Sequence, residues 1–328
     1  MKKWTFSYHI LLVAFVSLLA SCSEQSDVSV EGPKEDAVKL SLIQSLDSIN
    51  ESISPTSTVR KSAQGTSLST KDKITIAIAD ANGAYKGGKK GVKIGGAIGS
   101  YFGHPGAGSV AGGIAGAVVV GGLKSYLTFK KIEAQHQNGG VRQCADYNSL
   151  YSNATGAYDK LKYDSLDNNN LDFVEPDVHS AVIVDDSIVN YSLLTDAESK
   201  IGLTHNLMVA YLDGKIAIDS NAVSTDSSYQ YVKEMFESEE FINSCKEIAS
   251  KDQTSEESDL PTEVMDRFTD IYERYVNSCD DVAFIIRKYI EVIEDSPELS
   301  QEDKENIKYG FATALYSTNY WCKELKEN

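Results

Sequence analysis

The sequence predicts a mainly α-helical protein with a flexible N-terminal tether, a glycine-rich helical hairpin and a C-terminal domain like a helical bundle. Three observations carry this prediction. Glycines recur every four residues in one apolar segment, amphipathic patterns with spacings of three and four recur after residue 140, and the residues before 70 are mostly polar. Spacings of three and four place side chains on one face of a helix, so both regular regions are read as helices.

The N-terminus has the features of an export signal. Two lysines precede an apolar stretch, residues 10–19, which is short for a transmembrane helix of about 20 residues. The stretch ends in Leu19-Ala20-Ser21-Cys22, and the whole segment resembles a bacterial lipoprotein signal. The resemblance implies that residues 1–21 are removed and that Cys22 becomes the first residue, acylated with fatty acids such as palmitate. An ordinary signal peptide or an anchor helix is the alternative.

The residues after Cys22 carry expectations about location. In lipoproteins of this class a residue other than Asp after the cysteine favours the outer membrane, and this position is Ser23. Glu24 and Asp27 resemble the acidic surface-export signals of Bacteroidota lipoproteins. We therefore expect a lipid-anchored outer-membrane protein of the cell envelope, and the acidic residues indicate exposure at the cell surface.

The charge distribution excludes one class of partner and indicates another. The formal net charge is −17, which argues against nucleic-acid binding because phosphate contacts need clustered basic residues. Between Ala81 and Ile132, however, there are seven lysines and no acidic residue. A basic, glycine-rich insert in an acidic chain favours contact with an anionic membrane surface. The alternative is that these lysines only solvate a helix face.

Residues 22–73 are expected to form an acidic tether, because they are rich in Ser, Thr, Asp and Glu and cannot bury a core. Within them, Lys34–Ile53 carries apolar residues at spacings of three and four, which predicts a short amphipathic helix.

Residues 74–131 are predicted to form a glycine-zipper hairpin. Its helices, Ile74–Phe102 and Gly108–Phe129, are joined by Gly103-His104-Pro105-Gly106, a sequence that suits a turn. Glycines four residues apart make a groove in which a second helix can approach closely, so these residues are predicted to pack against a helix or within a membrane. They are Gly83, Gly87, Gly91, Gly95, Gly99, Gly103, Gly108, Gly112 and Gly116. No formal charge occurs from Ile94 to Leu123.

The run from Gly83 to Gly122 resembles glycine-zipper segments of double-glycine bacteriocin precursors and of membrane-active outer-membrane lipoproteins. The resemblance implies a hairpin that associates with membrane or with copies of itself. A hairpin buried in its own domain and an unstructured segment are the alternatives. Two shorter pieces, residues 201–206 and 314–321, are similar to uncharacterised Bacteroidota lipoproteins, a family without an assigned activity.

Residues 140–328 are expected to form the helical domain. The apolar positions from Tyr231 to Ile242 predict one helix that ends near Ala249. Pro261 begins another, Val282–Ile293 forms a third, and Ser300 with Asp303 makes a capping box for the last. Residues 137–177 show no clear pattern.

Few residues indicate chemistry. Gly83–Lys90 is close to a P-loop but has Lys where magnesium binding needs Ser or Thr. His205 beside Asn206 is the one candidate for a catalytic imidazole, and no histidine has the spacing of a metal ligand. Cys144, Cys245, Cys279 and Cys322 allow two disulfides in an oxidising compartment, with buried thiols as the alternative.

These features predict a non-enzymatic outer-membrane lipoprotein without cofactor or metal, whose hairpin associates with membrane or self-associates, as a toxin or bacteriocin would. The alternative is a surface-exposed helical binding module in which the hairpin is only a packed structural element. The protein partner is not predicted.

Overall fold

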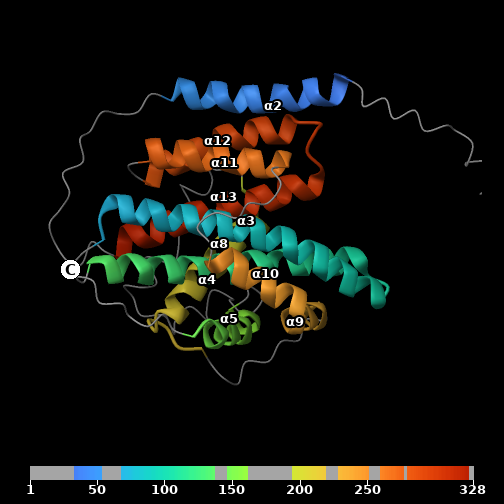
Figure 1. Ribbon diagram of the computed structural model, residues 1–328, viewed down its shortest axis with the longest axis vertical. Coiled ribbons are helices and arrows are strands. Elements are labelled where there is room, and N and C mark those ends of the chain that lie inside the picture. Colours follow the sequence, from blue (N-terminus) through green and yellow to red (C-terminus); the bar gives the residue numbers. More distant parts are fainter. Residues whose placement is uncertain are drawn as a thin grey trace, which may run out of the picture. The chain divides into compact units, whose positions relative to one another are not determined.

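The computed structural model describes residues 33–53, 68–136, 146–161, 194–218, 228–250, 259–276 and 279–324, and within these ranges it contains helices and no strand (Figure 1). The helices are α2 (Pro33–Ser52), α3 (Thr70–Tyr101), α4 (Pro105–His136), α5 (Tyr147–Leu161), α8 (Asp196–Leu212), α9 (Tyr229–Glu237), α10 (Glu239–Ser250), α11 (Leu260–Tyr275), α12 (Cys279–Asp295) and α13 (Gln301–Glu324). The predicted fold class is confirmed.

The chain divides into two units, Met1–Lys39 and Leu40–Asn328. The first unit is described only from Pro33, so the predicted signal peptide, Cys22 and the first part of the tether lie outside the described residues. The second unit contains both the hairpin and the C-terminal helices. The segments that the sequence analysis treated separately, 74–131 and 140–328, therefore belong to one compact unit.

Two hydrophobic cores lie on either side of α3 and α13. One core joins the hairpin to α5, α8, α9 and α10, and it includes Tyr320 and Trp321 of α13. The other joins α2, α11 and α12 to the opposite faces of α3 and α13, where Tyr85 and Phe311 are buried. Figure 1 shows this order, with α11 and α12 on one side of the hairpin and α5 and α9 on the other. The hairpin is thus a central element of the fold.

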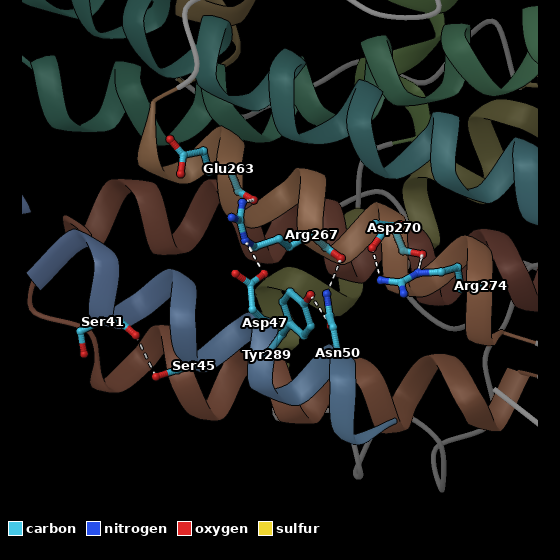
Figure 2. A network of polar contacts seen from close by, with 9 residues as sticks. All are labelled: Ser41, Ser45, Asp47, Asn50, Glu263, Arg267, Asp270, Arg274 and Tyr289. Carbon is cyan, nitrogen blue, oxygen red and sulfur yellow. Dashed lines mark hydrogen bonds and ion pairs between the residues drawn. The ribbon is translucent and has the colours of Figure 1, made fainter. Parts of the chain in front are cut away.

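The short helix expected at Lys34–Ile53 is α2, and from Leu42 onward it packs on the second core. Leu42 and Leu46 are buried, and Asn50 connects α2 to two other helices (Figure 2). The Asn50 amide donates to the carbonyl oxygen of Arg267 at 3.2 Å, and the Tyr289 hydroxyl donates to Asn50 Oδ1 at 2.9 Å. This part of the predicted tether is therefore built into the domain.

One helix boundary was predicted wrongly. The expected single helix up to Ala249 is divided into α9 and α10, because Ser238 adopts an extended conformation with ψ of 135°. The Ser238 hydroxyl then accepts from the Phe241 N–H at 3.3 Å and caps α10. Ser300 and Asp303 cap α13 as predicted, and the segment left without assignment contains α5.

Candidate functional site: the glycine hairpin and its polar cluster

A tight turn at Gly103 joins α3 to α4. The His104 N–H donates to the Gly99 carbonyl at 2.8 Å, and the Gly103 N–H donates to the Ser100 carbonyl at 3.1 Å. This pair of hydrogen bonds forms a Schellman motif, which needs a left-handed residue at its centre. Gly103 supplies it with φ of 78°. Pro105 then begins α4, where its missing N–H costs nothing.

The predicted glycines line the contact between the two helices. Three antiparallel pairs face each other, namely Gly87 with Gly116, Gly91 with Gly112 and Gly95 with Gly108. A Cβ atom on any of these six would lie less than 3.0 Å from the carbonyl oxygen of its partner, which real Cβ atoms essentially never do. Gly83 and Gly99 extend the same contact toward Lys124 and His104. The zipper face is therefore occupied within the chain.

A second set of glycines, which the sequence analysis did not select, serves the outer faces of the hairpin. Gly88 lies against Tyr309 of α13, and Gly121 and Gly122 lie against His205 and Met208 of α8. These glycines occur next to another glycine, as in Gly87-Gly88. The doubled glycines were the signal that the hairpin contacts other helices as well as itself.

The middle of helix α4, from Gly112 to Ser125, is largely buried. The side chains of Ala117, Val118, Val119, Val120 and Leu123 have no exposed surface. By length and composition alone, α4 could cross a membrane, and no other helix in the described ranges could; 67% of its apolar window is buried inside the fold. A buried core helix passes the same test.

The loop end of the hairpin is exposed and apolar. Tyr101 is 91% exposed, Val110 53% and Phe102 45%. Phe102 also contacts the ring of Tyr231 on α9, with 5.5 Å between the ring centroids. Of the four large hydrophobic residues exposed in the described ranges, only Phe284 of α12 lies elsewhere.

At least three of the seven lysines of the hairpin contact acidic or carbonyl groups of the same chain. Lys89 is paired with Asp259. Lys130 lies 2.9 Å from Asp213, and the buried Lys124 donates to the Ala249 carbonyl at 3.4 Å. The anionic-membrane interpretation of these lysines is therefore weakened, because acidic residues and carbonyl groups of the same chain already neutralise or bind part of the set.

A buried polar cluster connects the hairpin to α8 and α13. Asp80 of α3 accepts a hydrogen bond from Ser125 of α4 at 2.9 Å, and Ser317 of α13 donates to the same oxygen, Oδ2. His205 Nε2 of α8 lies 3.8 Å from that oxygen. The imidazole also contacts Asn206 Oδ1 at 3.3 Å. All five side chains are buried, so four central helices meet at one carboxyl group.

Burial determines the charge of this cluster. Desolvation raises the pKa of Asp80 to about 8, although the Ser317 and Ser125 hydroxyls oppose the shift. Desolvation lowers the pKa of His205 to about 4, against its contact with Asn206. Between about pH 4 and about pH 8, the Asp80 carboxyl and the His205 imidazole are both neutral. The 3.8 Å pair is therefore a neutral carboxyl beside a neutral imidazole rather than an ion pair.

The cluster differs from the catalytic triad of a hydrolase in two respects. In a triad the serine hydroxyl donates to the imidazole and the carboxylate orients that imidazole. Here Ser125 and Ser317 both donate to Asp80 instead, and the His205 side chain has no exposed surface. The geometry gives His205 a structural position between helices.

The structure describes only some of the cysteines, which are the other candidate site residues. Cys245 has a free, buried thiol, and burial raises its pKa. Cys22 and Cys144 lie outside the described residues, as does the side chain of Cys279, so pairing among the cysteines other than Cys245 stays a prediction. The described part of the chain contains no group of three residues suited to a metal ion.

A comparison of the chain with protein-family models, curated proteins and solved structures found no match.

Proposed function

We propose that this protein is a non-enzymatic lipoprotein of the outer membrane, held by an acyl chain on Cys22, whose glycine hairpin associates with a membrane. The observation that carries the proposal is the hairpin itself. It has no formal charge from Ile94 to Leu123, its two helices pack backbone to backbone, and its loop end is exposed and apolar.

The energetics of glycine are compatible with this function. Each glycine in a helix costs about 1 kcal/mol relative to alanine, so the isolated hairpin would be a poor helix former in water. In the fold this cost is offset by packing against α8 and α13. In a bilayer, close packing of small residues offsets it again, and the satisfied backbone of a helix is the form that lipid tolerates. The hairpin therefore suits both environments.

Membrane association is favoured over self-association through the zipper. Eight of the nine predicted zipper glycines already face the other helix of the same hairpin, and the ninth forms the turn. Two copies could pair through these faces only after both hairpins had opened.

The test uses the chain from residue 22 onward with Cys22→Ser, so that no acyl chain attaches it to lipid. The protein is mixed with dye-loaded vesicles that contain a photoactivatable lipid, and the vesicles are floated on a density gradient. We expect co-flotation and crosslinks within residues 94–123, with α12 peptides as the internal control. Dye release would extend the function to a toxin-like activity.

The second candidate function is a helical binding module in which the hairpin serves as a packed element. The burial of Ala117–Val120 favours it. Protein that stays at the bottom of the gradient without crosslinks would support this second function and refute membrane association.

A further inference from the structure

The loop end of the hairpin is the part of the structure that the fold leaves uncovered. Residues 101–107 are all exposed, and Tyr101 at 91% is almost fully in water. Val110, one turn into α4, is also exposed. The end contains two aromatic rings, a proline and glycines but no formal charge. Nothing in the packing of the hairpin explains why an aromatic residue occupies position 101.

We propose that this loop end, formed by Tyr101, Phe102 and Val110, is a docking surface for the interface of a lipid bilayer. It enters first, while the rest of the Leu40–Asn328 unit keeps its fold. The proposal rests on the proposed function for its choice of a membrane. It adds which surface contacts the bilayer and that this surface enters before any other part of the fold. Aromatic residues prefer the boundary between lipid and water, where a ring is buried and a hydroxyl stays hydrated.

Two observations favour lipid over a second copy of the chain. A stable protein interface involves about 20–30 residues on each side, whereas the exposed apolar patch has three large side chains. The patch is also continuous with α4, which begins at Pro105 and is the helix with the length and apolar composition of a membrane span. A surface that is small and leads directly into such a helix fits a bilayer better than a dimer.

The charges near this end do not select anionic lipid. Lys93 is exposed on α3, and α9, whose Tyr231 contacts Phe102, carries one lysine, Lys233, beside two acids, Glu234 and Glu237, so these charges nearly cancel. We therefore expect binding to depend on apolar contact, with little change when anionic lipid is added.

The experiment places a reporter at the loop end. Removal of residues 1–21 leaves Trp321 as the single tryptophan, and it is buried in the first core. Tyr101→Trp adds a second tryptophan at the exposed end, and Phe284→Trp adds one at the control site on α12, which is 42% exposed. Each protein also carries Cys22→Ser and is mixed with phosphatidylcholine vesicles, with or without phosphatidylglycerol, that contain brominated acyl chains.

We expect quenching and a blue shift for the tryptophan at position 101, and neither change at position 284 or for Trp321. The variant Tyr101→Ser/Val110→Ser should bind vesicles at least about tenfold more weakly, because two side chains no longer leave water. Phe284→Ser should bind as the parent does. Circular dichroism checks that each variant is folded. We expect each to fold, because positions 101, 110 and 284 are exposed.

Four outcomes would overturn the proposal. Vesicle binding without quenching at position 101 would refute the docking surface but leave the proposed function standing. Quenching of Trp321 together with position 101 would refute docking with an intact fold. A dimer in sedimentation that Tyr101→Ser/Val110→Ser abolishes would show that the surface belongs to a second copy. Absence of any vesicle binding would remove the proposed function as well.

Discussion

Substitution of Gly112 by alanine tests whether the hairpin depends on backbone contact. A Cβ at position 112 would lie within 3.0 Å of the Gly91 carbonyl oxygen, and Gly95 Cα would be at 3.0 Å. Both neighbours belong to the backbone of α3, so no side chain can rotate away. Overpacking typically costs about 1–3 kcal/mol, and a rigid backbone neighbour favours the upper part of that range. Alanine returns about 1 kcal/mol of helix propensity, so we expect a net loss of about 2 kcal/mol.

The matched control is Gly106→Ala in the first turn of the same helix. A Cβ there meets nothing within 4 Å, so alanine should leave stability unchanged or raise it by up to about 1 kcal/mol. The assay is urea unfolding followed by circular dichroism, comparing midpoints at equal slopes. If Gly112→Ala were as stable as Gly106→Ala, the close helix contact would be incorrect.

Three other predictions concern the rest of the fold. Asp80→Asn should stabilise the protein increasingly as the pH rises from 5 to 8. The pKa of Asp80 is about 8 in the folded protein and 3.8 in the unfolded chain, so the wild-type protein loses stability over that pH interval. If urea unfolding showed instead that Asp80→Asn is less stable at every pH, Asp80 and His205 would form an ion pair. Asn50→Ala should cost about 1–3 kcal/mol in the same assay because it leaves buried groups unpaired, whereas Asp47→Ala, which removes an exposed pair with Arg267, should cost less than about 1 kcal/mol. Cys245 should resist a thiol reagent at pH 8 until urea unfolds the protein, and peptide mass spectrometry that finds it modified in native protein would contradict its burial.

Local signals predicted most of the hairpin and several other helices. The spacing of glycines and the Gly103-His104-Pro105 sequence depend on contacts within a few residues, and the capping of α13 by Ser300 and Asp303 is also local. The division between α9 and α10 was missed although Ser238-Glu239-Glu240 has the composition of a helix start. The apolar periodicity continues across Ser238, so it favoured a single helix over a new helix start at that serine.

The polar cluster could not be predicted, because four of its five side chains are far apart in the sequence and meet only through packing. Asp80, Ser125, His205 and Ser317 come from four helices. One signal was present: Asp80 is the single acidic residue between Lys73 and Glu133. An acid directly after the largely apolar stretch of residues 74–79 calls for buried partners, but the sequence does not identify which helices supply them.

The glycine pattern determines how α3 meets α4 but not what surrounds the pair, since close packing serves a protein core and a bilayer equally. The two environments differ in the packing and the hydrogen bonds that the folded protein loses on entering them. Docking by the loop end removes Tyr101 from water and breaks no packing, because that side chain is already exposed. Insertion of α4 would separate it from α8 and α13 and would break the hydrogen bond from Ser125 to Asp80. Insertion of the whole hairpin would instead break the hydrogen bond from Ser317 of α13 and carry the Asp80 carboxyl into lipid. With the pKa of Asp80 near 8, the carboxyl is neutral at neutral pH, which lowers the cost of either environment. Contact at the loop end is thus the step available to the folded protein, and Trp321, packed beside Phe129 of α4, distinguishes it from insertion.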